Sequence, residues 1–141
     1  MKYQSIEKLN RVQQYIMQTR PILQKEALFS DGTKDYRIPA EPKENEWVTI
    51  RFRTAKDNVD MVLLHTNGHA YQMRLGESDG TFDYYYAEIS LGTDVFSYYF
   101  EIVSGMFRCW YDRCGVTKEI REAYFFRIVP GFSTPDWAKG A

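Results

Sequence analysis

The sequence predicts an all-β protein, folded as an antiparallel β-sandwich of about eight short strands with a helix at its N-terminus. Aromatic residues make up 16% of the chain, including 11 Tyr and 9 Phe, and such residues favour strands over helices. Short segments in which apolar and polar residues alternate recur along the chain, separated by turn-forming residues. A chain of 141 residues can bury one sizeable core, so we expect a single domain.

The first residues have the pattern of an amphipathic helix. Ile6, Leu9 and Ile16 recur at helical spacing before Pro21 ends the run. We therefore expect a helical extension over residues 1–24. It either packs on its own domain or forms a partner-binding or dimer-forming arm.

Residues 47–54, with the sequence WVTIRFRT, are the clearest strand. Val48, Ile50 and Phe52 are expected to face inward and the residues between them outward, as in a sheet with one face exposed to solvent. The stretch before this strand is rich in Pro and charged residues. It predicts a loop that contains one short strand at residues 27–29.

The next two apolar runs, residues 59–64 and 70–75, are separated by a turn at residues 66–68. We expect them to form a hairpin. Residues 82–102, FDYYYAEISLGTDVFSYYFEI, carry the largest aromatic surface in a strand pattern, with Phe100 on the inward face of the second arm. The short SLGTD segment predicts that this stretch is a β-hairpin at the middle of a sheet.

The last part of the sandwich is expected to continue from Ser104-Gly105 into residues 106–112. Residues 115–122 are polar and predict a loop or a single helical turn. Residues 123–129, AYFFRIV, predict the final strand.

Composition excludes several classes of function. Lys and Arg number 18 against 19 Asp and Glu, so the net charge of -1 leaves no basic stripe for nucleic acid. The sequence shows no secretion signal and no apolar run of about 18 residues, so we expect no membrane partner and a cytoplasmic location.

The sequence also lacks the common motifs of catalysis. It has no nucleophile-elbow motif and no phosphate-cradling glycine loop. The turn between His65 and His69 prevents a helix from aligning them as metal ligands, so we expect satisfied or solvent-facing histidines. Cys109 and Cys114 have no second pair with which to form a zinc site and are expected to be free thiols. We expect no catalytic residue, no metal site and no cofactor.

Exposed aromatic rings are the feature that indicates a ligand. A ring with a polar edge can stack under the apolar face of a sugar while nearby groups bind its hydroxyls. The candidates are Trp47, Tyr71, Tyr85, Tyr99 and Trp110. Each ring could instead shield a sheet edge or an interface.

Five segments match a known pattern: KEALFSDGTKDYRIP, VTIRFRTAKDNVD, FDYYYAEI, YYFEI and PGFSTPDWAKGA. They resemble the N-terminal domain of neopullulanase-like and cyclomaltodextrinase-like enzymes of the alpha-amylase family, over residues 25–141. The resemblance implies an immunoglobulin-like sandwich of carbohydrate-binding module family thirty-four at residues 25–130. It also implies that residues 131–141 are a linker into a catalytic barrel that this sequence does not include.

The resemblance implies a non-catalytic domain of an alpha-glucan hydrolase, because the catalytic aspartate and glutamate of the family lie on the barrel. It implies a homodimer in which this domain covers the partner's active-site cleft and lends an aromatic residue to a pocket for alpha-glucan or maltooligosaccharide. The matching loop is HTNGHAY, which assigns that contact to Tyr71, with His69 beside it. Two other interpretations remain open: an independent starch-binding module, and a β-sandwich protein-interaction domain without a carbohydrate role.

Overall fold

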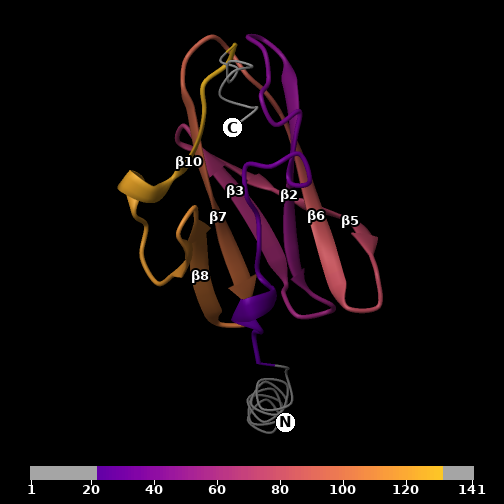
Figure 1. Cartoon of the computed structure of the whole chain (residues 1–141). Coiled ribbons are helices and arrows are strands. Elements are labelled where there is room, and N and C mark those ends of the chain that lie inside the picture. Colours follow the sequence, from indigo (N-terminus) through magenta and orange to yellow (C-terminus); the bar gives the residue numbers. More distant parts are fainter. Residues whose placement is uncertain (1–21, 132–141) are drawn as a thin grey trace, which may run out of the picture.

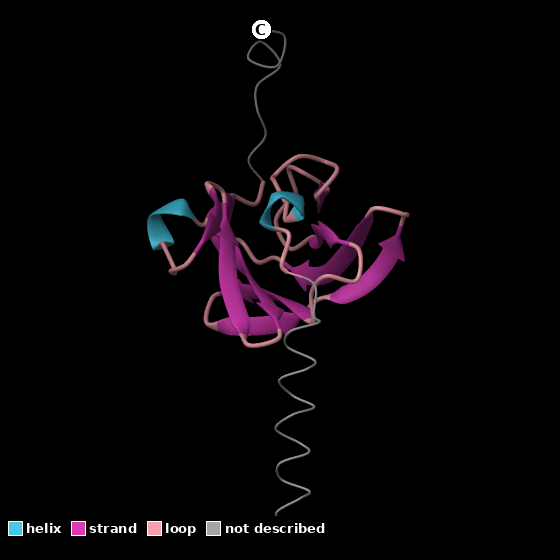
Figure 2. Ribbon diagram, turned by 90° about the horizontal axis from the view of Figure 1, so that it is seen from below, coloured by secondary structure: helices cyan, strands magenta, loops and turns pink. Residues whose placement is uncertain are grey.

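The computed structural model describes residues 22–131, which form two antiparallel sheets packed as layers (Figures 1 and 2). The four-stranded sheet has the order β1 (Arg37–Ile38), β2 (Trp47–Ala55), β6 (Phe82–Ser90) and β5 (Arg74–Ser78). The six-stranded sheet has the order β4 (His69–Gln72), β3 (Met61–Thr66), β7 (Phe96–Ser104), β8 (Phe107–Asp112) and β9 (Gly115–Thr117), and β10 (Phe126–Ile128) pairs with β7. Two short 3-10 helices, η1 (Lys25–Ala27) and η2 (Glu122–Tyr124), complete the described part. The helix expected before Pro21 lies outside the described part, as does the linker expected at residues 131–141 except for its first residue, Gly131.

The core lies between the two sheets and is rich in aromatic rings. The expected alternation of β2 is confirmed, because Val48, Ile50 and Phe52 are fully buried. Phe52 meets Phe100 of the opposite sheet with ring centroids 4.6 Å apart, and Tyr98 stacks on Phe126 at 5.1 Å. Burial of such rings supplies the main favourable free energy of the fold.

The expected hairpin over residues 82–102 is wrong. Its first arm, β6, pairs with β2 and β5, whereas its second arm, β7, pairs with β3, β8 and β10 in the other sheet. Leu91 is 3% exposed, and its amide donates to Glu46 O. The chain after β6 is therefore held beside the start of β2 before it crosses to the opposite layer. Period-two alternation identified both strands but carried no information about their partners.

The strand expected at residues 70–75 is two strands. Met73 is 3% exposed, and its amide donates to Val62 O at 2.8 Å. The chain passes at this buried residue from β4 in one sheet to β5 in the other. The hairpin expected from residues 59–64 and 70–75 is confirmed in β3 and β4. Its two turn residues are Asn67 and Gly68, at φ values of 46° and 80°.

Three smaller expectations also needed correction. The strand expected at residues 27–29 does not form: Ala27 is the last residue of η1, and Phe29 makes only an isolated bridge with Arg53. The polar residues 115–122 contain the short strand β9 and the start of η2. The final strand is limited to β10, because η2 occupies part of the expected range.

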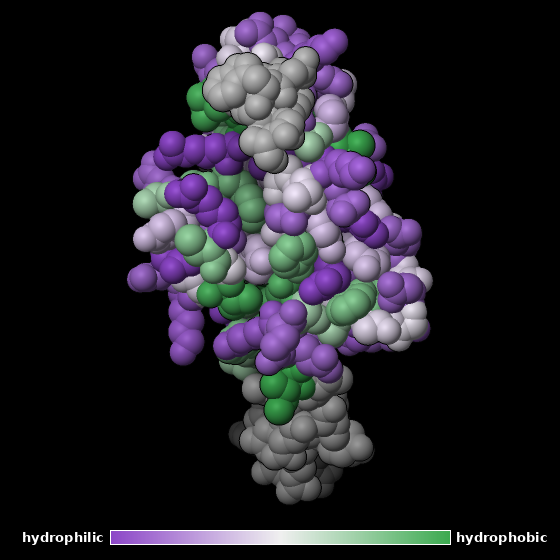
Figure 3. Space-filling view, viewed as in Figure 1, coloured by the Kyte–Doolittle hydropathy of each residue, from purple (hydrophilic) through white to green (hydrophobic). Residues whose placement is uncertain are grey.

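The surface mixes polar and apolar residues. On the face seen in Figure 3, green apolar residues are interspersed with purple polar ones. Within residues 22–131, no helix has the length and hydropathy needed to cross a membrane.

Candidate functional site

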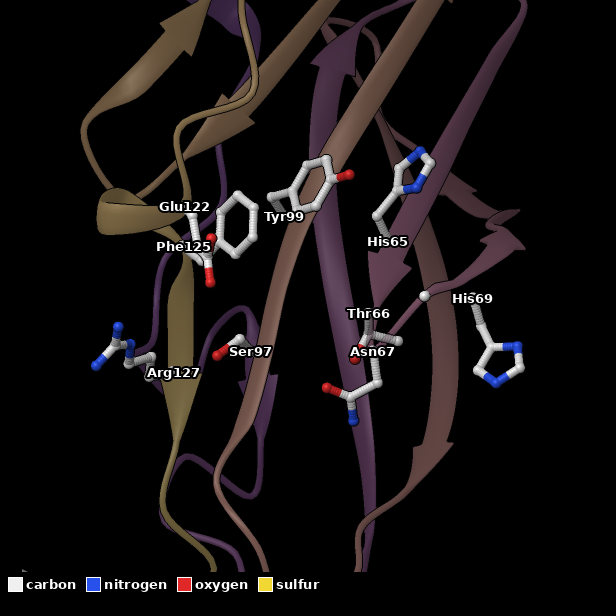
Figure 4. Close-up of a pocket in the computed structure, with 10 residues that line it drawn as sticks. His65, Thr66, Asn67, His69, Ser97, Tyr99, Glu122, Phe125 and Arg127 are labelled. Carbon is white, nitrogen blue, oxygen red and sulfur yellow. The ribbon is translucent and has the colours of Figure 1, made fainter.

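A groove lies on the outer face of the six-stranded sheet, between the β3–β4 turn and the segment that contains η2 and β10 (Figure 4). Its volume is about 520 Å³. The lining groups include imidazole, hydroxyl, amide, carboxylate and guanidinium groups, a set that can both donate and accept hydrogen bonds. The lining residues are His65, Thr66, Asn67, Gly68, His69, Ser97, Tyr99, Glu122, Phe125 and Arg127.

Three rings form a stack along one side of this groove. The ring centroids of His65 and Tyr99, which are cross-strand partners in β3 and β7, lie 4.8 Å apart at an interplanar angle of 6°. Phe125 stacks on Tyr99 at 4.4 Å and 17°. Both faces of the Tyr99 ring are thus covered, and its burial, followed by the nearby Glu101 charge, raises its pKa. Tyr99 presents an edge and a hydroxyl rather than a flat face.

A buried carboxylate fixes one end of the stack. Glu101 is 8% exposed, and its Oε1 lies 2.6 Å from His65 Nε2. Its other oxygen, Oε2, lies 2.8 Å from Arg108 Nε. Two donors on one carboxylate hold the imidazole in a single orientation against Tyr99. His65 is therefore a satisfied histidine, as expected, and His69 is exposed, also as expected.

Tyr71 and His69 lie together on the edge strand β4. Their ring centroids are 6.3 Å apart, and Tyr71 is 45% exposed. They are paired with Leu64 and Thr66 of β3 and share the face of those residues. His69 also reaches the groove. Tyr71, one of the candidate rings, is therefore accessible at the sheet edge.

Apart from Tyr99 in the stack, the three remaining candidate rings lie away from Tyr71 and His69. Trp110 is half-buried on β8 and is the cross-strand partner of Glu101. Trp47 is 64% exposed at the start of β2 in the opposite sheet, paired with Ser90. Tyr85 was expected to be exposed, and this is wrong: it is 8% exposed on the core-facing side of β6, where burial raises its pKa. A buried ring cannot serve as a platform for a sugar.

The protein-family comparison decides what this sandwich is. Residues 23–130 match the model of the family described as "Alpha amylase, N-terminal ig-like domain". The chain belongs to this family.

Solved structures have a fold similar to that of this alpha-amylase N-terminal Ig-like domain. A "Cyclomaltodextrinase" matches with a TM-score of 0.64 and 21% identity, over 82% of this chain and 22% of that one. The type III pullulan hydrolase from Thermococcus kodakarensis matches with a TM-score of 0.50 and 21% identity, over 77% and 18%. The maltogenic amylase from S. marinus matches with a TM-score of 0.61 and 15% identity, over 84% and 17%. At these identities the likeness shows the fold, and the chain spans about a fifth of the length of these structures.

Sequence reasoning missed several residues that build the groove of this alpha-amylase N-terminal domain. His65, Glu101 and Phe125 were not proposed as members of a site, although His65 and Tyr99 each lie at an outward position of a recognisable strand. Their contact depends on the register between β3 and β7, which no local pattern specifies. Among the described residues, no group of three or more His, Cys, Asp or Glu side chains is placed to hold a metal ion.

Proposed function

We propose that this chain is a non-catalytic N-terminal domain of an alpha-glucan hydrolase and acts beside a catalytic barrel of the same enzyme. The observation that carries the proposal is the family match over residues 23–130. The similar structures are a cyclomaltodextrinase, a pullulan hydrolase and a maltogenic amylase, which supports alpha-glucan as the substrate class. In this proposal residues 1–24 are an extension, residues 25–130 are the sandwich and residues 131–141 are the linker into the barrel.

The proposed role of the domain is to form a homodimer and to shape the active site of the partner subunit. Tyr71 is the ring proposed to contact the glucan, because it is 45% exposed on an edge strand with His69 beside it. A phenol ring at such a position offers a flat face for stacking and a hydroxyl for hydrogen bonding. Trp47 and Trp110 are proposed as further glucan contacts.

An independent starch-binding module is the second candidate, favoured by the 64% exposure of Trp47 on the other sheet. Affinity electrophoresis of the chain in amylopectin gels separates the two. A starch-binding module is retarded, and Trp47→Ala abolishes the retardation. A domain that contacts glucan only at a shared active site, or a protein-interaction domain without a carbohydrate role, migrates as it does in a gel without polysaccharide.

The coding sequence that follows Ala141 tests the main proposal most directly. The motifs of an alpha-amylase barrel are expected there. A reading frame without such a barrel, together with strong retardation in amylopectin, would favour the independent module instead.

The chain alone is expected to hydrolyse no alpha-glucan, because its sequence contains no acid and nucleophile constellation. The measurement is the release of reducing sugar from pullulan, cyclodextrin and starch by the purified chain, with a heat-killed sample as the control. Release above that control contradicts the assignment of a non-catalytic domain.

A further inference from the structure

The groove on the outer face of the six-stranded sheet contains a small residue, Ser97, among larger ones. Ser97 and Tyr99 are two residues apart on β7, so they lie on the same face of the sheet. Ser97 pairs with Arg127 of β10 on one side, and the β3–β4 turn with Asn67 lies on the other. The serine side chain is much shorter than these neighbours, so a space remains above it. We call this space the Ser97 hollow.

Two polar side chains point toward the Ser97 hollow from different elements. Figure 4 shows the Asn67 amide directed from the β3–β4 turn toward β7, and the Glu122 carboxylate directed from η2 toward Ser97. Within residues 22–131, no hydrogen bond or ion pair joins these two side chains, or that of Ser97, to another residue. A carboxylate accepts hydrogen bonds, and an amide and a hydroxyl both donate and accept them. The three groups can therefore bind a ligand that has hydroxyl groups.

A buried hydroxyl without a partner adjoins the turn end of the groove. Thr66 is 5% exposed and lines the groove. Its Oγ1 is one of two buried side-chain nitrogen or oxygen atoms that lack a hydrogen-bond partner in the described part of the chain. An unpaired buried polar atom is unfavourable. A hydrogen-bonding ligand that reaches this end of the groove would supply the missing partner.

Phe125 provides an apolar wall beside the carboxylate. Tyr99 covers one face of its ring at a centroid distance of 4.4 Å, and no other ring of the described residues contacts it. Glu122 lies next to this ring (Figure 4). A sugar ring has C–H groups on its faces and hydroxyls at its edge, so it can pack on an aromatic wall while a nearby carboxylate accepts from its hydroxyls.

The charges of the groove favour a neutral ligand. Its lining contains one carboxylate, that of Glu122, and one guanidinium, that of Arg127, so with neutral histidines its formal charges cancel. A site without net charge does not attract an ion of either sign. The volume of about 520 Å³ lies within the range of about 300 to 1,000 Å³ that is usual for small-molecule sites. A neutral molecule rich in hydroxyl groups fits this groove better than an ion does.

We propose that the Ser97 hollow binds one glucosyl unit of an alpha-glucan, at a site separate from Tyr71. The choice of alpha-glucan rests on the proposed function, whereas the choice of a hydroxyl-rich ligand rests on the groove itself. Tyr71 shares the face of its partner Leu64 and does not line the groove. In this proposal the domain holds a glucan on its outer face, in addition to the contact at the sheet edge.

The test is a titration of the ¹⁵N-labelled chain with maltotriose, in which NMR follows the side-chain amide resonances of Asn67. A hollow that holds one unit should bind with a dissociation constant of about 1 to 10 mM, which a titration detects and gel retardation does not. A saturable shift is expected. Glu122→Gln should weaken the affinity about three- to tenfold, because a hydrogen bond to a charged group is lost. Glu119→Gln removes the same charge at an exposed position outside the groove and should leave the affinity unchanged.

Ser97→Leu fills the hollow and should abolish the shift, whereas Ser97→Ala keeps the space and should weaken the affinity about two- to fivefold. Thermal unfolding of both variants tests whether they fold, and Glu122→Gln and Ser97→Ala decide if Ser97→Leu does not. The site is overturned if the wild-type chain shows no saturable shift, or if Glu122→Gln and Ser97→Ala both keep the wild-type affinity. It is also overturned if Tyr71→Ala, and not Ser97→Leu, abolishes the shift. The proposed function survives each of these outcomes, because the coding sequence after Ala141 tests it separately.

Discussion

At the scale of single residues, the environment of each aromatic ring decides what its removal changes. Phe100 and Tyr71 lie on strands of the same sheet, yet Phe100 is 0% exposed and Tyr71 is 45% exposed. Phe100 contacts Phe52, Tyr98 and Phe126 within the core. Tyr71 has only His69 as a ring neighbour among the described residues. Their substitutions should therefore separate stability from function.

Phe100→Ala is expected to lower the free energy of unfolding by about 3 to 5 kcal/mol, because it leaves a cavity among packed rings. Urea unfolding measures the loss. Phe107→Ala is the matched control: Phe107 is 42% exposed and its removal should cost less than about 1 kcal/mol. A loss below about 1 kcal/mol for Phe100→Ala would show that this face of β7 does not carry the core.

Tyr71→Ala is expected to leave the melting temperature nearly unchanged, because its ring is exposed at a sheet edge. In the proposed full-length enzyme it should weaken catalysis on small cyclic or branched glucans by about 1 to 2 kcal/mol in the transition state, or about 5- to 30-fold in kcat/KM. Steady-state kinetics and thermal unfolding are measured together. Tyr124→Ala is the control, because Tyr124 is a 40% exposed tyrosine outside the proposed contact.

Kinetics within about twofold of wild type, combined with a clear fall in melting temperature, would assign Tyr71 a packing role. That outcome would remove Tyr71 from the proposed glucan contact. It would leave the family assignment intact, because that assignment rests on residues 23–130 as a whole.

At the scale of elements, arginine and aromatic side chains cover the outer face of the four-stranded sheet. Arg51 lies over the ring of Tyr84 at 3.8 Å, and Arg53 over that of Phe82 at 4.4 Å. Tyr86 donates its hydroxyl to Glu77, which also pairs with Arg51. These contacts explain why the outward rings of β6 are half-buried although they do not face the core.

Gly76 allows the edge strand β5 to join this face. Its position lies between Leu75 and Glu77, where the register with β6 shifts. A Cβ at Gly76 would lie 2.5 Å from Tyr86 Cε2. Gly76→Ala should therefore displace the ring and lower the free energy of unfolding by about 1 to 3 kcal/mol.

Gly80→Ala is the matched control for Gly76, because a Cβ at Gly80 meets no atom within 4 Å. Urea unfolding compares the two variants. The double variant Gly76→Ala and Tyr86→Ala should lose much less than the sum of the single changes, since the clash disappears with the ring. Equal losses for Gly76→Ala and Gly80→Ala would contradict the close contact.

At the scale of the whole molecule, the buried phenols make the fold sensitive to alkali. Burial is the largest cause that raises the pKa of Tyr85, Tyr98 and Tyr111, and it also raises the pKa of the Cys109 thiol. Each group stays protonated in the folded protein to a higher pH than in the unfolded chain. The associated stability is fully present below the unfolded pKa, which is about 10 for Tyr and about 8.5 for Cys, and is lost as pH rises through the folded values.

The free energy of unfolding in urea is therefore expected to be steady near neutral pH and to fall above about pH 9 to 10. Phenolate absorbance of the folded and the urea-unfolded chain, recorded over the same pH series, provides the control. The unfolded chain should ionise its tyrosines at lower pH. Stability that stays constant while the phenols titrate identically in both states would refute this account.

The sequence by itself determined the class of the fold and the inward faces of the strands β2 and β7. The alternation in residues 47–54 placed Val48, Ile50 and Phe52 inward, and that in β7 placed Phe100 inward. The same residues carried the resemblance to alpha-amylase N-terminal domains. These properties are local, because a strand with one buried face must alternate with period two wherever it lies.

The tertiary structure alone decided which strands are neighbours and which side chains meet. It placed β6 and β7 in different sheets, divided the expected strand at Met73, and buried Tyr85. It also stacked His65, Tyr99 and Phe125 and brought Arg37 to Tyr98 across 61 residues of sequence. Strand partners and registers are selected by the shared burial of distant residues between two layers, so no local pattern can encode them.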